Sequence, residues 1–248
     1  MRVLLAGESW VTHSVHVKGV DSFNTSSYTE GADRLREALA AAQIEVDYLP
    51  GHLVPARFPG SAAELADYGA VILSDIGANS LLLSPDTFER SAVAPNRLTE
   101  LGRYVRDGGG LLMIGGYLSF AGIEGKARYH GTPVEDVLPV LIAEVDDRVE
   151  VPQGVVPVPA APGHPVLAGV AGPWPAVLGY NRVTPRPEAE VVVRCGADPL
   201  VACGQYHAGR SAVFTSDCAP HWAPPAFMDW PGYRALWPNL IRWLAGPA

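Results

Sequence analysis

The most informative run of residues is Gly109-Gly110-Leu111-Leu112-Met113-Ile114-Gly115-Gly116-Tyr117-Leu118-Ser119-Phe120. Its apolar centre, ending in paired glycines, predicts a buried parallel strand that turns sharply at its carboxyl end. In open α/β sheets, ligands and reactive groups lie at that end. A sharp strand-to-helix turn there pushes one side chain out of the packed layer, and here that side chain is Tyr117. A phenol with an ordinary pKa of about 10 is a poor nucleophile at neutral pH, but it donates a proton or a hydrogen bond.

Strands and helices alternate through the first half of the chain, up to an expected fourth strand at 111–114, which favours a mostly parallel sheet with helices on both faces. Ser61 and Glu64 form a capping-box pattern, and Ser84-Pro85-Asp86 is a helix-start signal. Gly108 follows a helical pattern and is expected to end it. The other expected strands of the first half are 3–6, 45–49 and 70–74, and the longer expected helices are 28–42 and 96–106.

The second half is less regular, with a strand or hairpin expected at 140–151 and a proline-rich connection after it. Further strands are expected at 190–194, 200–203 and 211–215, the first two antiparallel. An amphipathic pattern over 233–244 predicts a closing helix. Its inward side chains are Leu236, Leu240, Trp243 and Leu244. Without repeats or linkers, we expect residues 1–248 to form a single domain.

Composition narrows the function classes. A chain of 248 residues with 48% hydrophobic residues can bury a large core. A net charge of −8 without a basic cluster argues against nucleic acid as a partner. No stretch is long and apolar enough for a membrane span, and the first seven residues suit a strand better than a signal peptide. Three cysteines without framework spacing suit a reducing compartment, so we expect a cytoplasmic protein.

A long polar segment, 8–27, follows the first strand and is expected to be a loop. A loop of this length in a compact domain is usually functional or disordered, although a surface loop tied by its own hydrogen bonds is the alternative. Its residues could bind an anionic or polyhydroxyl ligand. His13 and His16 also raise the question of a metal, but their spacing is loose and a third ligand would have to come from Asp21, Asp217 or His221. The polar and aromatic residues of this region are Glu8, Ser9, Trp10, His13, His16, Lys18, Asp21, Asn24 and Tyr28.

Two other strand ends carry reactive side chains. Asp75 follows the third strand and would either orient a ligand hydroxyl or cap the next turn. Asp217, Cys218 and His221 follow the last central strand and contain the parts of a thiol-activating group. A free cysteine is more often a small buried hydrophobe, so we expect Asp217 and His221 to serve a ligand pocket instead. Cys195 is expected to pack within a strand, as is Cys203.

Three motifs, 7–13, 108–120 and 214–222, together resemble a bacterial group of class I glutamine amidotransferase-like cytoplasmic proteins, relatives of the ThuA-like trehalose-utilisation proteins. The resemblance covers essentially the whole chain and implies a flavodoxin-like three-layer α/β/α fold. Class I amidotransferases hold their cysteine in a Gly-x-Cys-x-Gly elbow. The corresponding stretch here is 115–119, with Tyr117 in place of the cysteine and Ser119 in place of the second glycine. A phenol cannot form the thioester of glutamine hydrolysis, so the resemblance implies the pocket but not that activity.

Three functions remain open at this stage. In the first, the pocket binds a small polar, sugar-like metabolite and acts by acid–base chemistry, with Tyr117 as acid or oxyanion donor, His13 or His221 as base, and Asp75 and Asp217 as orienting carboxylates. In the second, the chain is a non-catalytic binding or assembly module, with a homo-oligomer as one form. In the third, Cys218 supports true amidotransferase or amidase chemistry. No cofactor or resident metal is expected, and the residues expected to contact a ligand are Glu8, Trp10, His16, Lys18, Asp75, Gly116 and Ser119.

Overall fold

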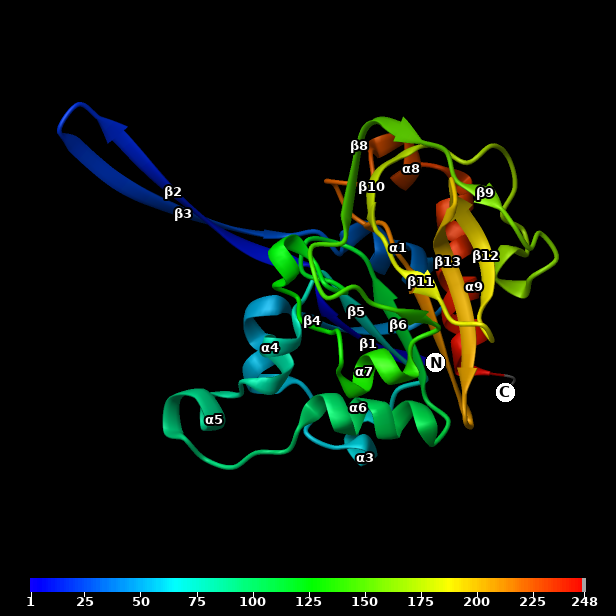
Figure 1. The fold of residues 1–248 in the computed structure, drawn as a ribbon, viewed down its shortest axis with the longest axis horizontal. Coiled ribbons are helices and arrows are strands. Elements are labelled where there is room, and N and C mark those ends of the chain that lie inside the picture. Colours follow the sequence, from blue (N-terminus) through cyan, green and yellow to red (C-terminus); the bar gives the residue numbers. More distant parts are fainter. Residues whose placement is uncertain (247–248) are drawn as a thin grey trace.

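The computed structural model describes residues 1–246 and is built around one eight-stranded mixed sheet (Figure 1). The first five strands in the order below run parallel, and the last three join by antiparallel pairing. Across the sheet the strands are β4 (Glu45–Pro50), β1 (Arg2–Gly7), β5 (Ala70–Ser74), β6 (Gly110–Ile114), β14 (Gly209–Phe214), β13 (Asp198–Tyr206), β12 (Glu190–Cys195) and β9 (Val158–Pro159).

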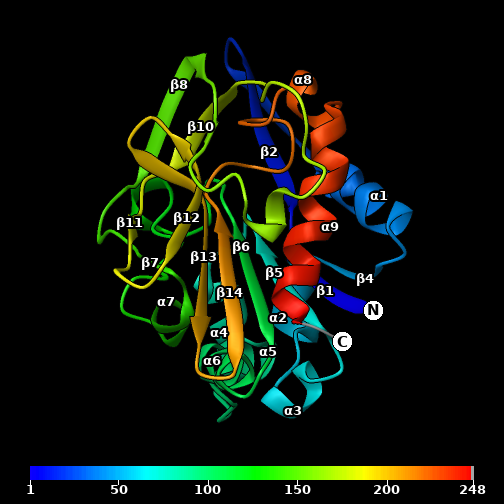
Figure 2. The same cartoon turned by 90° about the vertical axis from the view of Figure 1, so that its right-hand side faces the viewer.

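Helices cover both faces of this sheet, and Figure 2 shows α9 (Pro231–Ala245) and α6 (Arg97–Arg106) on either side of it. In one core, α9 and α1 (Asp33–Ala41) pack against sheet residues such as Leu112. In the other core, α6 packs against the alternate residues of the sheet, such as Leu111. Because successive residues of a strand face opposite sides, β6 serves both cores. The flavodoxin-like three-layer fold is therefore confirmed. The shorter helices are α2 (Val54–Arg57), α3 (Ala62–Leu65), α4 (Ala78–Leu82), α5 (Pro85–Arg90), α7 (Pro133–Val137), α8 (Pro225–Met228), η1 (Gly51–Leu53), η2 (Ile123–Gly125) and η3 (Pro165–Leu167).

The helix-start residues predicted in the first half of the chain are confirmed by the structure. Ser61 caps α3 by accepting the Glu64 N–H, and Ser84 caps α5 by accepting the Thr87 N–H. Asn96 caps α6 in the same way, so the helix expected over 96–106 is confirmed within one residue. All four strands expected in this half are confirmed. These elements are short-range features, because a side chain that satisfies the first free N–H groups of a helix acts only on its own turn.

The prediction of a loop over residues 8–27 is wrong. These residues form a hairpin of β2 (Ser9–Lys18) and β3 (Asp21–Glu30), joined by Gly19 and Val20, which projects from the body as a long arm (Figure 1). The segment is rich in Ser and Thr, so the alternation of its side chains between two faces is not evident from the sequence. In the structure its ten residue pairs are in regular register. The helix expected over 28–42 starts only at Asp33, since its first residues belong to β3.

The second half differs in two places. The strand or hairpin expected at 140–151 is two separate strands, β7 (Val140–Leu141) and β8 (Arg148–Val155), which pair with β11 (Thr184–Pro185) and β10 (Val177–Asn181). No helix directly follows β6, because the chain enters left-handed conformations at Phe120 and Gly122. The three strands expected at the end of the sheet are confirmed, including the antiparallel pair.

The closing helix α9 buries Leu236, Leu240 and Leu244 as expected, while Trp243 is half-buried with Arg210 over its ring. Cys195 and Cys203 are buried strand residues, as expected. Among residues 1–246, no helix combines the length and apolar character needed to cross a bilayer. The last two residues of the expected single domain, 247–248, lie outside the described part.

Candidate active site

The carboxyl ends of four neighbouring parallel strands meet at one edge of the sheet and carry the candidate residues. Glu8 directly follows β1, and Asp75 directly follows β5. Tyr117 lies three residues beyond β6, and Asp217 lies three residues beyond β14. Parallel strands end at the same edge, so the sequence brings these side chains together although they are far apart in the chain.

A cavity of about 380 Å³ opens among these side chains. Its wall combines three carboxyl groups with aromatic and apolar surfaces. Trp10 comes from the root of the arm, and His221 comes from the loop after β14. The lining residues are Glu8, Trp10, Asp75, Tyr117, Leu118, Asp217, Pro220 and His221.

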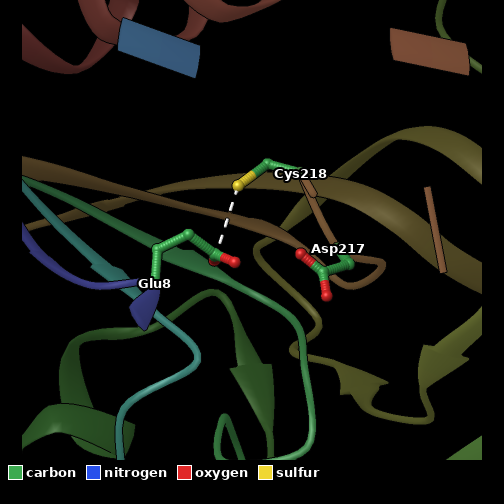
Figure 3. Close-up of side chains that lie close together, drawn as sticks. All are labelled: Glu8, Asp217 and Cys218. Atoms are coloured by element: carbon green, nitrogen blue, oxygen red, sulfur yellow. Dashed lines mark hydrogen bonds between the residues drawn. The ribbon is translucent and has the colours of Figure 1, made fainter. Parts of the chain in front are cut away.

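Glu8 and Asp217 of the cavity wall lie close together, beside Cys218 (Figure 3). The Oε2 atom of Glu8 accepts a hydrogen bond from Ser74 Oγ at 2.5 Å and faces the Cys218 thiol at 3.6 Å. Asp217 Oδ1 accepts the Ala219 N–H at 3.0 Å. Glu8, Ser74 and Cys218 are thus joined by hydrogen bonds, and Asp217 lies beside them, all four groups being buried at the ends of β1, β5 and β14.

Burial and mutual repulsion keep protons on this carboxyl cluster, which we define as Glu8, Asp75 and Asp217. Burial, with a smaller contribution from the charge of Asp75, raises the pKa of Glu8 to about 7. Burial also raises the pKa of Asp217, and the charges of Glu8 and Asp75 raise it further. Burial raises the pKa of Asp75 above its usual value. Three carboxyl groups this close do not all ionise near neutral pH, so the cluster holds protons that it can give to a ligand.

The loop after β6 is fixed by Asp75. Its Oδ1 atom accepts the Leu118 N–H at 2.6 Å, while its own N–H donates to Ser119 Oγ at 3.2 Å. Ser119 in turn donates to the Ile114 carbonyl at 2.5 Å. Gly116 has φ of 148°, and a Cβ there would lie 2.7 Å from the Asp75 carboxylate, so only glycine fits without displacement.

Tyr117 forms the outer wall. Its ring meets His221 edge-on at 4.2 Å between centroids, and the Arg148 guanidinium lies 4.7 Å over it. Its hydroxyl donates to Glu150 Oε1 at 3.1 Å, and Glu150 also accepts the Trp222 ring N–H at 3.0 Å. Burial raises the pKa of Tyr117, which keeps the phenol protonated.

His221 is the basic side chain of the cavity. Its Nδ1 atom lies 4.0 Å from Asp217 Oδ2. Burial lowers the pKa of its imidazole, while the nearby carboxylates of Glu150 and Asp75 act in the opposite direction. An imidazole that is neutral at pH 7 can accept a proton from a ligand hydroxyl.

The structure does not bring all expected site residues together. His13, His16 and Lys18 lie on exposed β2 of the arm, outside the cavity wall. His13 and His16 are three residues apart on a regular strand and so point to opposite faces, which rules them out as joint ligands of one ion. His13 instead contacts Ser26 at 2.8 Å, and His16 stacks on Phe23. Their expected place near the ligand followed from the prediction of a loop, whereas the segment is a strand that carries them away from the cavity.

Sequence reasoning also missed supporting residues from the second half of the chain. Asn181 accepts the Gly116 N–H at 3.0 Å and donates to Asp147 at 2.8 Å. Asp147 also accepts the N–H groups of Ala121 and Gly122, which shapes the turn after the elbow. No local motif marks these partners, because their roles arise only when the paired strands β8 and β10 bring them to the loop that follows β6.

Among residues 1–246, Glu8, Asp217 and Cys218 form the group that could offer ligands to a metal ion, since their ligand atoms lie within 4.8 Å of one another. Zinc binds cysteine as a thiolate. Burial raises the pKa of Cys218 well above its ordinary value, and Glu8 Oε2 accepts the Ser74 hydroxyl. A bound ion would therefore have to deprotonate the thiol and displace the Ser74 hydrogen bond.

Comparisons with known proteins agree with this fold. A family model described as "Putative glutamine amidotransferase" matches residues 2–246. Two solved structures, the cytoplasmic proteins STM3548 and STM1381 of Salmonella typhimurium, each share 46% identity with this chain, cover 98% of it and 99% of their own length, and superpose with a TM-score of 0.95. A structure described as "Putative thua-like protein" from Parabacteroides merdae has 12% identity, a TM-score of 0.57, and coverage of 99% and 90%, a likeness of fold alone. No curated protein matches the chain.

Proposed function

The chain belongs to the family described as "Putative glutamine amidotransferase", and we propose that within this family it binds a small polyhydroxylated metabolite and transforms it by acid–base chemistry. The observation that carries this proposal is the carboxyl cluster at the cavity wall. Since the two similar Salmonella proteins are described as cytoplasmic, we propose the same compartment for this chain.

The cavity chemistry favours a neutral or amine-bearing sugar-like ligand over an anionic one. Protonated carboxyl groups donate hydrogen bonds to hydroxyls and ionised ones accept them, whereas any ionised member of the cluster repels carboxylates and phosphates. Lys18, the one lysine considered as an anion partner, lies on the arm instead. The rings of Trp10 and Tyr117 add flat apolar surfaces against which a sugar ring packs.

Each side chain has a role in this proposal. Glu8, with a pKa of about 7, gives a proton to the ligand near neutral pH. His221 accepts a proton, and Asp217 beside it orients the imidazole. Tyr117 donates a hydrogen bond to an oxygen of the ligand when that oxygen replaces Glu150 Oε1, its present acceptor. Asp75 positions the loop that carries Tyr117. The base role falls to His221 rather than His13, because only His221 lines the cavity.

True amidotransferase chemistry through Cys218 is the weaker alternative. Its side chain is completely buried and is absent from the cavity wall. Burial raises the pKa of the thiol, which disfavours the thiolate that attacks an amide. The elbow position of the family carries Tyr117, which cannot form a thioester.

The first experiment is a thermal-shift screen with neutral sugars, amino sugars, sugar acids, sugar phosphates and glutamine. We expect neutral or amino sugars to raise the Tm, and Tyr117→Phe and His221→Ala to weaken that rise. The matched controls are Tyr206→Phe and His207→Ala, an edge-to-face pair at 4.8 Å on the β13–β14 turn, away from the cavity.

Two outcomes overturn the proposal. Stabilisation by acids or phosphates alone contradicts the ligand class. Equal stabilisation in Tyr117→Phe, His221→Ala and the control variants contradicts the site. A ligand that binds but that the wild type does not convert makes the chain a binding module, and the acid–base step is then wrong.

A further inference from the structure

The arm, residues 9–30, is the least explained part of the molecule. Its two ten-residue strands extend away from the sheet into solvent (Figure 1), and nearly every residue of both is exposed. An isolated two-stranded ribbon is at best marginally stable in water. We therefore expect a ribbon of this length to be stabilised by packing against another surface.

The root of the arm is held firmly, so its direction is fixed. Gly31 N–H donates to the Glu8 carbonyl at 2.9 Å, and Tyr48 donates to the same carbonyl at 3.0 Å. Ser9 Oγ accepts the Gly51 N–H at 2.7 Å. A ribbon anchored in this way presents one constant surface rather than sampling many.

The arm lacks the devices that protect exposed strands. Lone edge strands normally carry charges, prolines or bulges that prevent pairing with another chain. Here the register is regular, no proline is present, and charged residues occur only at the turn and the root. These are Lys18, Asp21 and Glu30.

One face of the ribbon carries a row of exposed valines. Val11, Val15 and Val17 point to the same side of β2, with Val15 and Val17 each 70% exposed, and Tyr28 of β3 lies opposite Val11. Beyond the root, the remaining side chains of that face are uncharged and polar or His13, while the opposite face carries Trp10 and the stacked pair His16 and Phe23. The valines and Tyr28 therefore leave apolar surface exposed on one side of the ribbon.

The same molecule offers a matching surface. An apolar recess of about 320 Å³ lies on α4 and α5, lined among others by Pro55, Leu83 and Phe88, whose ring is 75% exposed. Figure 1 shows α4, α5 and the arm projecting toward the same side of the body. A twofold axis on that side lets each copy receive the other's arm, the self-complementary arrangement of a symmetric dimer.

We propose that the arm clasps a second copy of this chain, with its valine face (Val11, Val15 and Val17) packed over the α4–α5 recess of that copy. Each copy contributes the residues of its valine face, about half of the arm, together with its own recess, and the two together approach the roughly 20–30 residues per side of a standard interface. A lipid surface fits less well, since the chain carries a net charge of −8 and the arm a single lysine.

The test is the molar mass in solution by sedimentation or light scattering at micromolar concentration. We expect the wild type to be a dimer and Val15→Lys and Val17→Lys to be monomers. Val145→Lys is the matched control, because Val145 is 69% exposed and lies outside the arm. Phe88→Asp is expected to weaken the dimer in the same way.

A wild type that remains monomeric overturns the proposal and directs attention to another partner. A dimer that survives Val15→Lys and Val17→Lys also overturns it, and one that survives Phe88→Asp overturns the assigned recess. Hydrogen exchange of the wild type needs no variant: amides of 9–30 are protected in the dimer, and rapid exchange throughout the arm contradicts the clasp. Because molar mass is independent of ligand binding, failure here leaves the proposed function untouched.

Discussion

The Asp75 carboxylate accepts the backbone N–H of Leu118 at 2.6 Å and thereby joins the loop after β5 to the loop after β6. In nucleophile elbows, the N–H that follows the reactive residue helps to build an oxyanion hole. Here that donor, next to Tyr117, points at an acid instead. The elbow of this protein is organised around a carboxyl group, which agrees with acid–base chemistry and not with acyl transfer.

Replacing Asp75 tests that link. Asp75 has φ of 43°, a conformation that asparagine tolerates better than alanine. We expect Asp75→Ala to lower the free energy of unfolding by about 1 kcal/mol, because the Leu118 N–H loses its carboxylate acceptor. Asp75→Asn keeps an acceptor oxygen and should cost much less. Urea unfolding of both variants decides this, and equal losses would show that the hydrogen bond is unimportant.

Gly116 tests the space around the same carboxylate. We expect Gly116→Ala to destabilise the fold by about 2 kcal/mol and to remove ligand-induced stabilisation, since the new Cβ meets Asp75 in a strained backbone conformation. Gly163→Ala is the control, because a Cβ at Gly163 meets nothing within 4 Å. Thermal and urea unfolding of the two variants should therefore differ clearly, and similar values refute the steric account.

The raised pKa of Glu8 makes the free energy of unfolding depend on pH, and the direction of the pKa shift sets the sign of that dependence. Its pKa is about 7 in the folded chain against an ordinary 4.5, so the folded state binds more protons between these values. The free energy of unfolding consequently falls as the pH rises through this window, by about 3 kcal/mol from this group. Glu8→Gln should flatten that part of the curve, measured by urea unfolding at a series of pH values. Glu188→Gln, an exposed site, should leave the slope unchanged.

Cys218 separates the two enzymatic hypotheses. Burial of its side chain and the raised pKa of its thiol predict slow alkylation by iodoacetamide, no faster than at Cys195 or Cys203. Mass spectrometry of the labelled peptides measures the three rates. Selective rapid labelling of Cys218, together with loss of ammonia release from glutamine in Cys218→Ser, would restore the amidotransferase hypothesis.

Sequence patterns were sufficient for the elements whose signals are local. The apolar run at 111–114, the caps at Ser61 and Ser84, and the alternation of strands and helices each act within a few residues, and the structure confirms them. In a parallel sheet, the carboxyl ends of neighbouring strands lie at the same edge. The residues that follow four such strands, Glu8, Asp75, Tyr117 and Asp217, are therefore expected to share that edge.

Contacts between distant segments fixed the rest. Ser- and Thr-rich residues 9–30 became a hairpin because their backbone groups satisfy one another across ten pairs, a pairing that no local composition reveals. That pairing carried His13, His16 and Lys18 away from the cavity and left Trp10 at its wall. The raised pKa of Glu8 likewise arises only when folding removes water and brings Asp75 close. The sequence by itself determined which acids are present and where the strands lie. Burial and strand register, which exist only in the folded chain, determined which acids hold protons and which side chains meet.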